Sequence, residues 1–285
     1  MLFSVVLLFV SFSAFSSLAA PVPSHVRAKA AYGGWPNSIK AGSSFGISGG
    51  FEKSYIGKGP QNEVALIGHY PKGSYAGSKP PGPGISGFIF EASGGPGVNI
   101  ASAKEARLTY KVRFEDGFDF QLGGKLPGLY GGANADIAKK CTGGYHNNKC
   151  WSARLMWRDH GAGELYAYLP TANQKLAVCK GKCDLKYGAS IDTGNYKFTP
   201  GRWIELSERV KLNDVGKMNG EIEVFQDGAS KILIKGIELR GSEEGRIFGA
   251  MIHTFFGGSS KPAYASPKDQ KAYFKDFRLE VTEKL

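Results

Sequence analysis

Apolar and polar residues alternate with a period of two over much of the chain. In RLTYKVRF, residues 107–114, the apolar side chains Leu108, Tyr110, Val112 and Phe114 share one face. Successive side chains of a β-strand point to opposite faces, so this segment is predicted to be a half-buried strand. Similar patterns predict further strands at residues 84–92, 118–122, 151–158, 164–169, 202–212, 221–228, 231–236, 246–256 and 272–281.

Turn signals of the Asp-Gly, Asn-Gly and Gly-Gly type separate these segments, and long helical periods are missing. Many short antiparallel strands favour an all-β fold, and we expect an antiparallel β-sandwich of jelly-roll type. A closed barrel is the alternative. We expect the jelly-roll domain to span residues 85–285, with a Gly/Pro-rich segment, residues 21–84, packed on the sandwich.

The first twenty residues are apolar and uncharged, and Pro21 follows them. This pattern predicts a secretory signal peptide with cleavage after Ala19 or Ala20, so we expect a secreted, extracellular protein. A membrane anchor is the alternative, but the apolar run is short for a bilayer span. After removal of the signal we expect no membrane association.

Four cysteines fall into two local pairs, and an exported protein can form disulfides. We expect Cys141 to pair with Cys150, and Cys179 with Cys183. Zinc is the alternative for clustered cysteines, but the first spacing is wide and no histidine lies near the second pair. We therefore expect no metal.

The formal net charge of +11 indicates a polyanionic partner. The chain has no motif of a nucleic-acid-binding module, so we expect an acidic polysaccharide and no nucleic acid. The plainer alternative is that the charge serves solubility alone. We expect the protein to act as a monomer.

The segment 151–169 predicts a β-hairpin with an unusual outer face. Burying its apolar residues on one core leaves Ser152, Arg154, Tyr166 and Tyr168 on the opposite side. A loop at 159–163 would pair Arg158 with Glu164, Met156 with Tyr166, and Arg154 with Tyr168. A guanidinium beside a phenol lowers the pKa of that phenol, which would create a base without histidine or carboxylate. Ordinary packing of arginine on tyrosine is the alternative.

A second segment, FDFQLGGKLPGLYGG, starts at Phe118. If it is extended, Asp119, Gln121, Gly123 and Lys125 share a face, while Phe118, Phe120 and Leu122 enter the core. The glycines before Lys125 permit close approach of a ligand. A Gly-Pro turn with a solvated lysine is the alternative.

These two segments, together with HTFFGGSS at residues 253–260, resemble polysaccharide lyase family 14 in order and spacing. The family contains alginate lyases and glucuronan-type lyases built on a β-jelly roll. The resemblance covers roughly residues 85 to 282 and implies a secreted lyase that needs no cofactor and cleaves a uronic-acid polymer by β-elimination.

Matched by motif, the resemblance assigns Lys125, Ser152, Arg154, Tyr166 and Tyr168 to the site. Removal of the C5 proton beside a carboxylate requires electrostatic stabilisation of a dianion. Arg154 and Lys125 would neutralise that carboxylate, and Tyr166 or Tyr168 would transfer protons, with Lys125 as an alternative base. Further substrate-binding candidates beside Ser152 are Gln121, Arg113 and His253, and Arg113 depends on which sheet holds its strand.

A lectin-like module that binds acidic polysaccharide without cleaving it is the rival hypothesis. It would not need a proton-transferring tyrosine beside an arginine. A glycoside hydrolase would show two carboxylates on one strand face, and the sequence has no such run.

Overall fold

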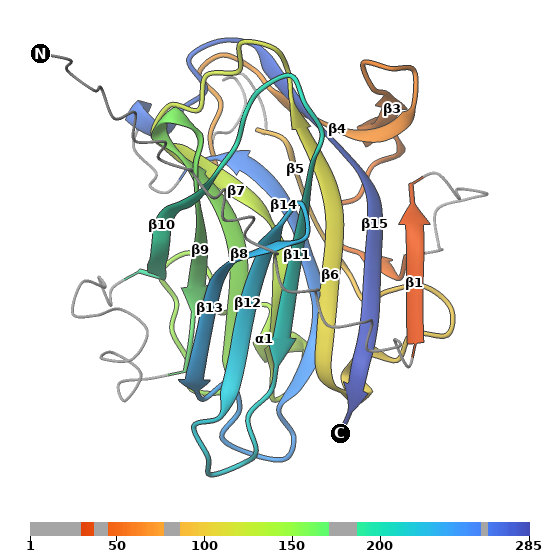
Figure 1. The fold of residues 1–285 in the computed structure, drawn as a ribbon, viewed down its shortest axis with the longest axis vertical. Helices are drawn as coiled ribbons and strands as arrows, with labels where there is room; N and C mark the ends of the chain where they lie inside the picture. The colour runs from red at the N-terminus through yellow and green to blue at the C-terminus, as the bar shows by residue number, and fades with distance from the viewer. Residues whose placement is uncertain (1–29, 37–44, 77–85, 171–186, 258–261) are drawn as a thin grey trace, which may run out of the picture.

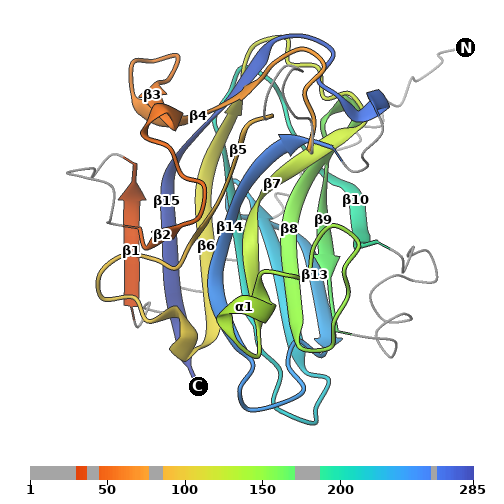
Figure 2. The same ribbon diagram turned by 180° about the vertical axis from the view of Figure 1, so that it is seen from behind.

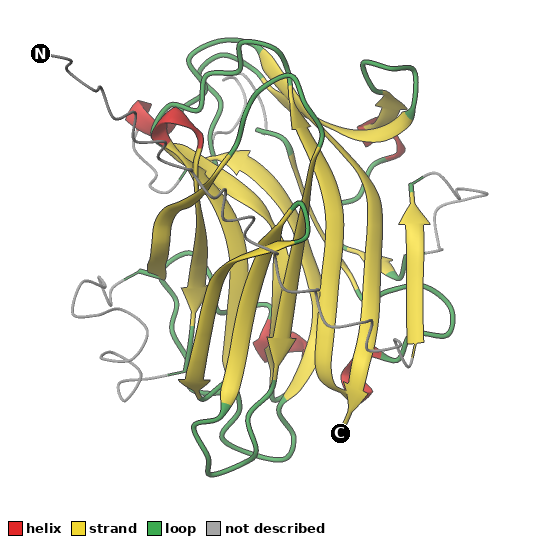
Figure 3. Cartoon of the chain, in the orientation of Figure 1, coloured by secondary structure: helices red, strands yellow, loops and turns green. Residues whose placement is uncertain are grey.

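The protein is an antiparallel β-sandwich of jelly-roll type, seen in a computed structural model that describes residues 30–36, 45–76, 86–170, 187–257 and 262–285 (Figure 1). Strands make up most of the described chain, and helices are confined to short turns (Figure 3). The two sheets lie face to face, with one core between them.

We call the eight-stranded layer sheet A; its order is β13-β12-β11-β6-β15-β4-β3, and β1 also pairs with β15. Its strands are β1 (Ala30–Trp35), β3 (Ile56–Lys58), β4 (Val64–Tyr70), β6 (Ala103–Phe114), β11 (Ile204–Lys211), β12 (Gly220–Gln226), β13 (Ala229–Ile237) and β15 (Gln270–Lys284).

The seven-stranded layer, sheet B, has the order β10-β9-β8-β7-β14-β5-β2 and faces the viewer in Figure 2. Its strands are β2 (Ile47–Ser48), β5 (Phe88–Ala92), β7 (Gly123–Gly132), β8 (Cys150–Arg158), β9 (Ala162–Tyr168), β10 (Ala189–Lys197) and β14 (Arg246–Phe256). The single turn of α-helix α1 (Ala135–Ala138) follows β7.

The sandwich predicted from alternation is confirmed, and the barrel alternative is wrong because each sheet ends at its own edge strands. The predicted division at residue 84 stays a prediction. The described part of segment 21–84 supplies β1 to β4, so it contributes strands to both sheets.

The prediction of a strand at residues 118–122 is wrong. Gln121 has a left-handed backbone, with φ of 47°, which breaks the alternation. Phe118 and Phe120 still enter the core, but Leu122 is 42% exposed instead of buried. The regular strand begins at Gly123.

Large aromatic side chains fill the space between the sheets. Trp157 of β8 is fully buried and packs edge-on against Phe114 of β6, with ring centroids 5.5 Å apart. A Cβ added at Gly124 would lie 2.0 Å from the Trp157 indole, so this position of β7 requires glycine. The Trp157 indole therefore excludes any side chain at position 124 of β7.

Strand β7 carries a bulge that sheet A supports through the core. Its pairing with both neighbours is interrupted between Lys125 and Gly128. The Tyr110 hydroxyl donates to the Pro127 carbonyl at 3.1 Å, and the Leu129 N–H donates to the buried Glu208 carboxyl at 2.7 Å. Two polar contacts from sheet A therefore satisfy backbone groups beside Lys125.

Candidate active site

Side chains from neighbouring strands of sheet B meet on its outer face. The register places Lys125 of β7 beside Met156 of β8, and Arg154 of β8 beside Tyr166 of β9. Tyr168 lies beside Ser152 in the next row. The common face predicted for Ser152, Arg154, Tyr166 and Tyr168 is therefore present.

The predicted register of the hairpin is wrong by two residues. Met156 pairs with Glu164 and Arg154 with Tyr166, because Trp157 pairs with Gly163 and the chain turns through the left-handed residues His160 and Gly161. A shift of two residues keeps every side chain on its face, so the apolar pattern could not detect it. Arg158 still reaches the Glu164 carboxylate, at 2.6 Å.

Two buried cations in this cluster have no acidic partner within 4.0 Å in the described part of the chain. The Lys125 Nζ contacts the Met156 Sδ and lies 3.5 Å from the centroid of the Tyr166 ring. The Arg154 guanidinium donates to the Thr142 hydroxyl at 2.5 Å and contacts His253 Nδ1 at 3.5 Å. Both side chains are at most 5% exposed.

The electrostatic state of both cations follows from this burial. Desolvation, with the nearby charges of Arg154 and Arg158, lowers the pKa of Lys125 well below its usual value. Burial lowers the pKa of Arg154 to about 10. Buried charges are ordinarily paired, so this site is prepared to receive an anion.

Both tyrosine hydroxyls accept a backbone N–H. The Gly188 N–H donates to Tyr166 at 3.1 Å, and the Gly144 N–H donates to Tyr168 at 2.9 Å. The pKa of Tyr166 is raised, because desolvation by burial and the adjacent Tyr168 outweigh the opposite effect of Arg158. The lowering effect of arginine is present at Tyr166, but burial outweighs it and favours the neutral phenol.

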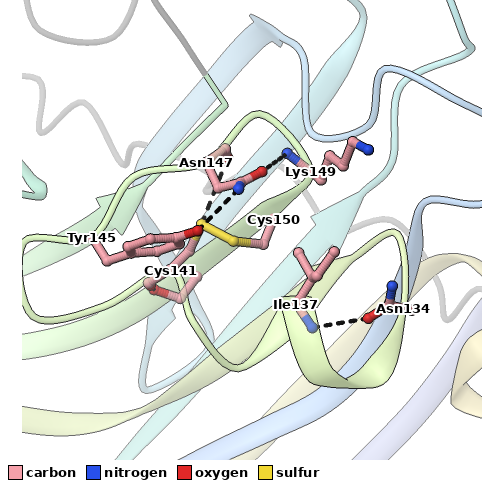
Figure 4. The surroundings of a disulfide bond; sticks show 8 residues. Asn134, Ile137, Cys141, Tyr145, Asn147, Lys149 and Cys150 are labelled. Atoms are coloured by element: carbon pink, nitrogen blue, oxygen red, sulfur yellow. Dashed lines mark hydrogen bonds between the residues drawn. A yellow bond between two sulfur atoms is a disulfide. The ribbon is translucent and has the colours of Figure 1, made fainter.

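The disulfide between Cys141 and Cys150 (Figure 4) closes a loop that contacts this cluster. It supplies the Thr142 hydroxyl to Arg154 and the Gly144 N–H to Tyr168. Ser152 is fully buried, and its hydroxyl donates to the Cys141 carbonyl at 2.6 Å. The predicted Cys141–Cys150 pair is confirmed, whereas Cys179 and Cys183 lie outside the described residues.

The remaining candidates fall in different places. His253 of β14 joins the cluster through Arg154. Arg113 lies on the outer face of sheet A, where it pairs with Asp116, so the core separates it from the cluster. Gln121 lies in the turn before β7, where its N–H donates to the Asp119 carboxylate. The structure therefore brings neither Arg113 nor Gln121 to Arg154.

Two contributors were missed in the sequence. Met156 lies on the predicted outer face, but a thioether gave no chemical signal. Gly188 packs on both tyrosines, since a Cβ there would lie 2.8 Å from each ring. Glu164, which the sequence placed opposite Arg158, does hold that arginine, and it also accepts from Thr193 at 2.6 Å.

No group of three or more His, Cys, Asp or Glu side chains suited to a metal occurs among the described residues. Within the same residues, no helix has the length and apolar character needed to cross a bilayer.

Comparison with known proteins identifies the class and then the family. The sandwich and its basic, tyrosine-bearing face are those of a polysaccharide lyase. The chain belongs to polysaccharide lyase family 14, whose model matches residues 59–277. Membership of a lyase family favours the enzyme over the lectin-like module. No curated protein matches the sequence.

Solved structures agree with this assignment. The PL-14 alginate lyase from Aplysia kurodai is 34% identical, with a TM-score of 0.70 over 82% of this chain and 89% of that one. The alginate lyase vAL-1 from Chlorella virus is 26% identical, with a TM-score of 0.68 over 84% and 93% of the two chains. The alginate lyase Aly36B shares the fold at 21% identity, with a TM-score of 0.64 over 88% and 96%.

Proposed function

We propose that this protein is an exported alginate lyase that cleaves its polymer by β-elimination. The observation that carries the proposal is a pair of buried basic side chains, Lys125 and Arg154, which lie beside two tyrosines and have no carboxylate within 4.0 Å among the described residues. The similarity to two alginate lyases at 34% and 26% identity supports alginate as the substrate.

Arg154 binds the carboxylate of the uronate whose C5 proton is removed. Its charge is not neutralised by any described carboxylate within 4.0 Å, and its low exposure strengthens the attraction to an anion. As the C5 proton leaves, negative charge spreads onto that carboxylate. The guanidinium then stabilises the dianion more strongly than it stabilises the bound substrate.

Lys125 and Tyr166 transfer the protons. Burial favours the neutral amine of Lys125 and the neutral phenol of Tyr166. The amine accepts the C5 proton, the electron pair of that C–H bond forms the C4–C5 double bond, and the C4–O bond breaks. The Tyr166 hydroxyl gives its proton to the leaving glycosidic oxygen. Tyr168 lies edge-on to Tyr166, with centroids 5.8 Å apart, and orients it.

The test is to incubate the purified mature protein with alginate and, separately, with glucuronan, while following the absorbance of the unsaturated product. Arg154→Ala should reduce kcat/KM on alginate by roughly a hundredfold or more. Arg202→Ala is the matched control, since this half-exposed arginine pairs with Asp227 in the turns that flank β11 and β12 of sheet A. Absence of unsaturated product from alginate would refute the proposal, and product from glucuronan alone would replace alginate with glucuronan as the substrate.

Export forms the second part of the proposal and depends on the apolar residues 1–20. Protein recovered from the medium of an expressing eukaryotic culture should begin at Ala20 or Pro21. A chain that keeps its first twenty residues and stays with the cells would contradict export.

A further inference from the structure

Arg154 contacts two side chains, Thr142 of the disulfide loop and His253 of β14. Its guanidinium extends across β7 to reach His253 of β14, with Nη1 3.5 Å from Nδ1. Gly128 of β7 lies between Arg154 and Met251 in the same row. A Cβ at Gly128 would lie 2.0 Å from the Ala153 carbonyl oxygen, so this row has no side chain on β7.

The partner of Arg154 determines the tautomer of His253. A guanidinium has only donors, so Nδ1 must present its lone pair, and the ring proton belongs on Nε2. That nitrogen lies 3.5 Å from the Glu91 carboxylate of β5. Glu91 is in turn 4.0 Å from the Lys139 ammonium. Glu91, neutral His253 and Arg154 therefore form a directed chain of contacts.

The charges around His253 disfavour its protonated form. Arg154 of β8 and Lys125 of β7 repel an imidazolium, whereas Glu91 of β5 attracts it, and Lys139 moderates that attraction. Burial is the largest effect, and the net result is a pKa of His253 below its usual value of 6.5. Protonation would also replace the Nδ1 lone pair with a second donor facing the guanidinium.

We propose that His253 is a positioning residue: its neutral imidazole, oriented by Glu91, holds the Arg154 guanidinium in place for the substrate carboxylate. This inference rests on the proposed function of Arg154. His253 was expected from the sequence to bind substrate directly; in this proposal it acts through Arg154 instead. Protonation of His253 releases Arg154, so activity falls as the pH decreases through the His253 titration.

Two substitutions separate positioning from simple packing. In His253→Asn, the amide oxygen occupies the place of Nδ1 and accepts from Arg154 without titrating. In His253→Gln, the amide lies near the position of Nε2, and the acceptor for Arg154 is lost. We expect kcat/KM of His253→Asn within about threefold of wild type at pH 8, and a loss of roughly tenfold or more for His253→Gln.

The pH profile is the decisive measurement. His253→Asn should lose the acid limb of kcat/KM assigned to His253, whereas His69→Asn, at an exposed histidine of β4, should keep it. Glu91→Gln removes the attraction that raises the pKa of His253, so the acid limb should move to lower pH. An unchanged acid limb in both His253→Asn and Glu91→Gln would overturn the inference.

The same measurements distinguish this inference from the proposed function. If Arg154→Ala keeps full activity, the role of Arg154 is wrong and the inference falls with it. If Arg154→Ala is inactive while His253→Gln has wild-type kcat and KM at every pH, only the positioning role fails. Circular dichroism and thermal unfolding of each variant identify a loss caused by misfolding, and Glu91→Gln then supplies the test.

Discussion

At the residue scale, the partners of a basic side chain decide what it can do. Arg209 on sheet A donates to three carboxylates, Glu105, Glu221 and Glu223, and these raise its pKa. Its charge is used within the fold. Lys125 has a thioether and an aromatic ring instead, and its pKa is lowered. A basic group of the second kind can respond to a bound anion and loses its proton more readily than an ordinary lysine.

Substitution of Lys125 by arginine tests its role as the base. Arginine keeps a positive charge but does not lose its proton in proteins. If the amine accepts the C5 proton, Lys125→Arg should lower kcat on alginate by roughly a hundredfold or more, as much as Lys125→Ala does. A Lys125→Arg enzyme with most of its wild-type kcat would show that Lys125 contributes only charge.

Gly188 tests how closely the tyrosines are held. A methyl group at this position would lie 2.8 Å from the rings of both Tyr166 and Tyr168. Gly188→Ala should therefore displace the rings and lower kcat by roughly tenfold or more. Gly241→Ala is the matched control, because the nearest atom to its added methyl group is 3.6 Å away. Equal kcat values for the two variants would contradict the close fit.

At the element scale, the sequence predicted faces better than pairings. The alternation in residues 151–169 correctly placed Arg154 and Tyr166 on one face, since the core selects the apolar side of each strand. The register depended on backbone conformations at His160 and Gly161, and the apolar pattern carries no information about these. Likewise, residues 118–122 do not form the predicted strand, because Gln121 adopts a left-handed backbone conformation that alternation does not reveal.

The disulfide loop contacts two residues of the site, and removal of its disulfide should affect both stability and binding. The bridge closes a loop with a sequence separation of 9. Chain entropy then gives it roughly 2.5 kcal/mol of stability. Cys141→Ala/Cys150→Ala should lower the Tm and raise KM for alginate, because Thr142 and Gly144 contact Arg154 and Tyr168. A variant with a lower Tm but wild-type KM would limit the loop to a stabilising role.

At the scale of the whole molecule, the two sheets are linked beneath the site by a buried carboxyl. Glu208 of β11 accepts from Leu129 of β7, and desolvation raises its pKa well above the usual value. No strand pattern could predict this contact, because it depends on the packing of one sheet on the other. The alternating pattern of β11 marks position 208 only as inward-facing.

The stability of the fold should depend on pH through Glu208. Its folded-state pKa is raised, so the native protein binds more protons than the unfolded chain above pH 4.5. This group therefore lowers stability as the pH rises from 4.5 toward its folded-state pKa. Within that range, ionisation of Glu208 lowers the free energy of unfolding by about 1.4 kcal/mol per pH unit. Glu208→Gln keeps an acceptor for Leu129 and should abolish this decrease. Urea unfolding of both proteins at pH 5 and pH 8 measures it, and parallel pH dependences would contradict it.

The buried amino group of Lys125 also has a consequence for the stability of the folded enzyme. Lys125→Met would replace it with an apolar chain against Met156 and Tyr166, giving an inactive protein that is more stable by about 1–3 kcal/mol in urea unfolding. Equal or lower stability of Lys125→Met would contradict this. The wild-type enzyme should recover the difference when alginate fills the site, because a ligand that binds only the native state raises the Tm. Substrate would then protect this lyase from heat, and the exhaustion of its polymer would leave it at its most fragile.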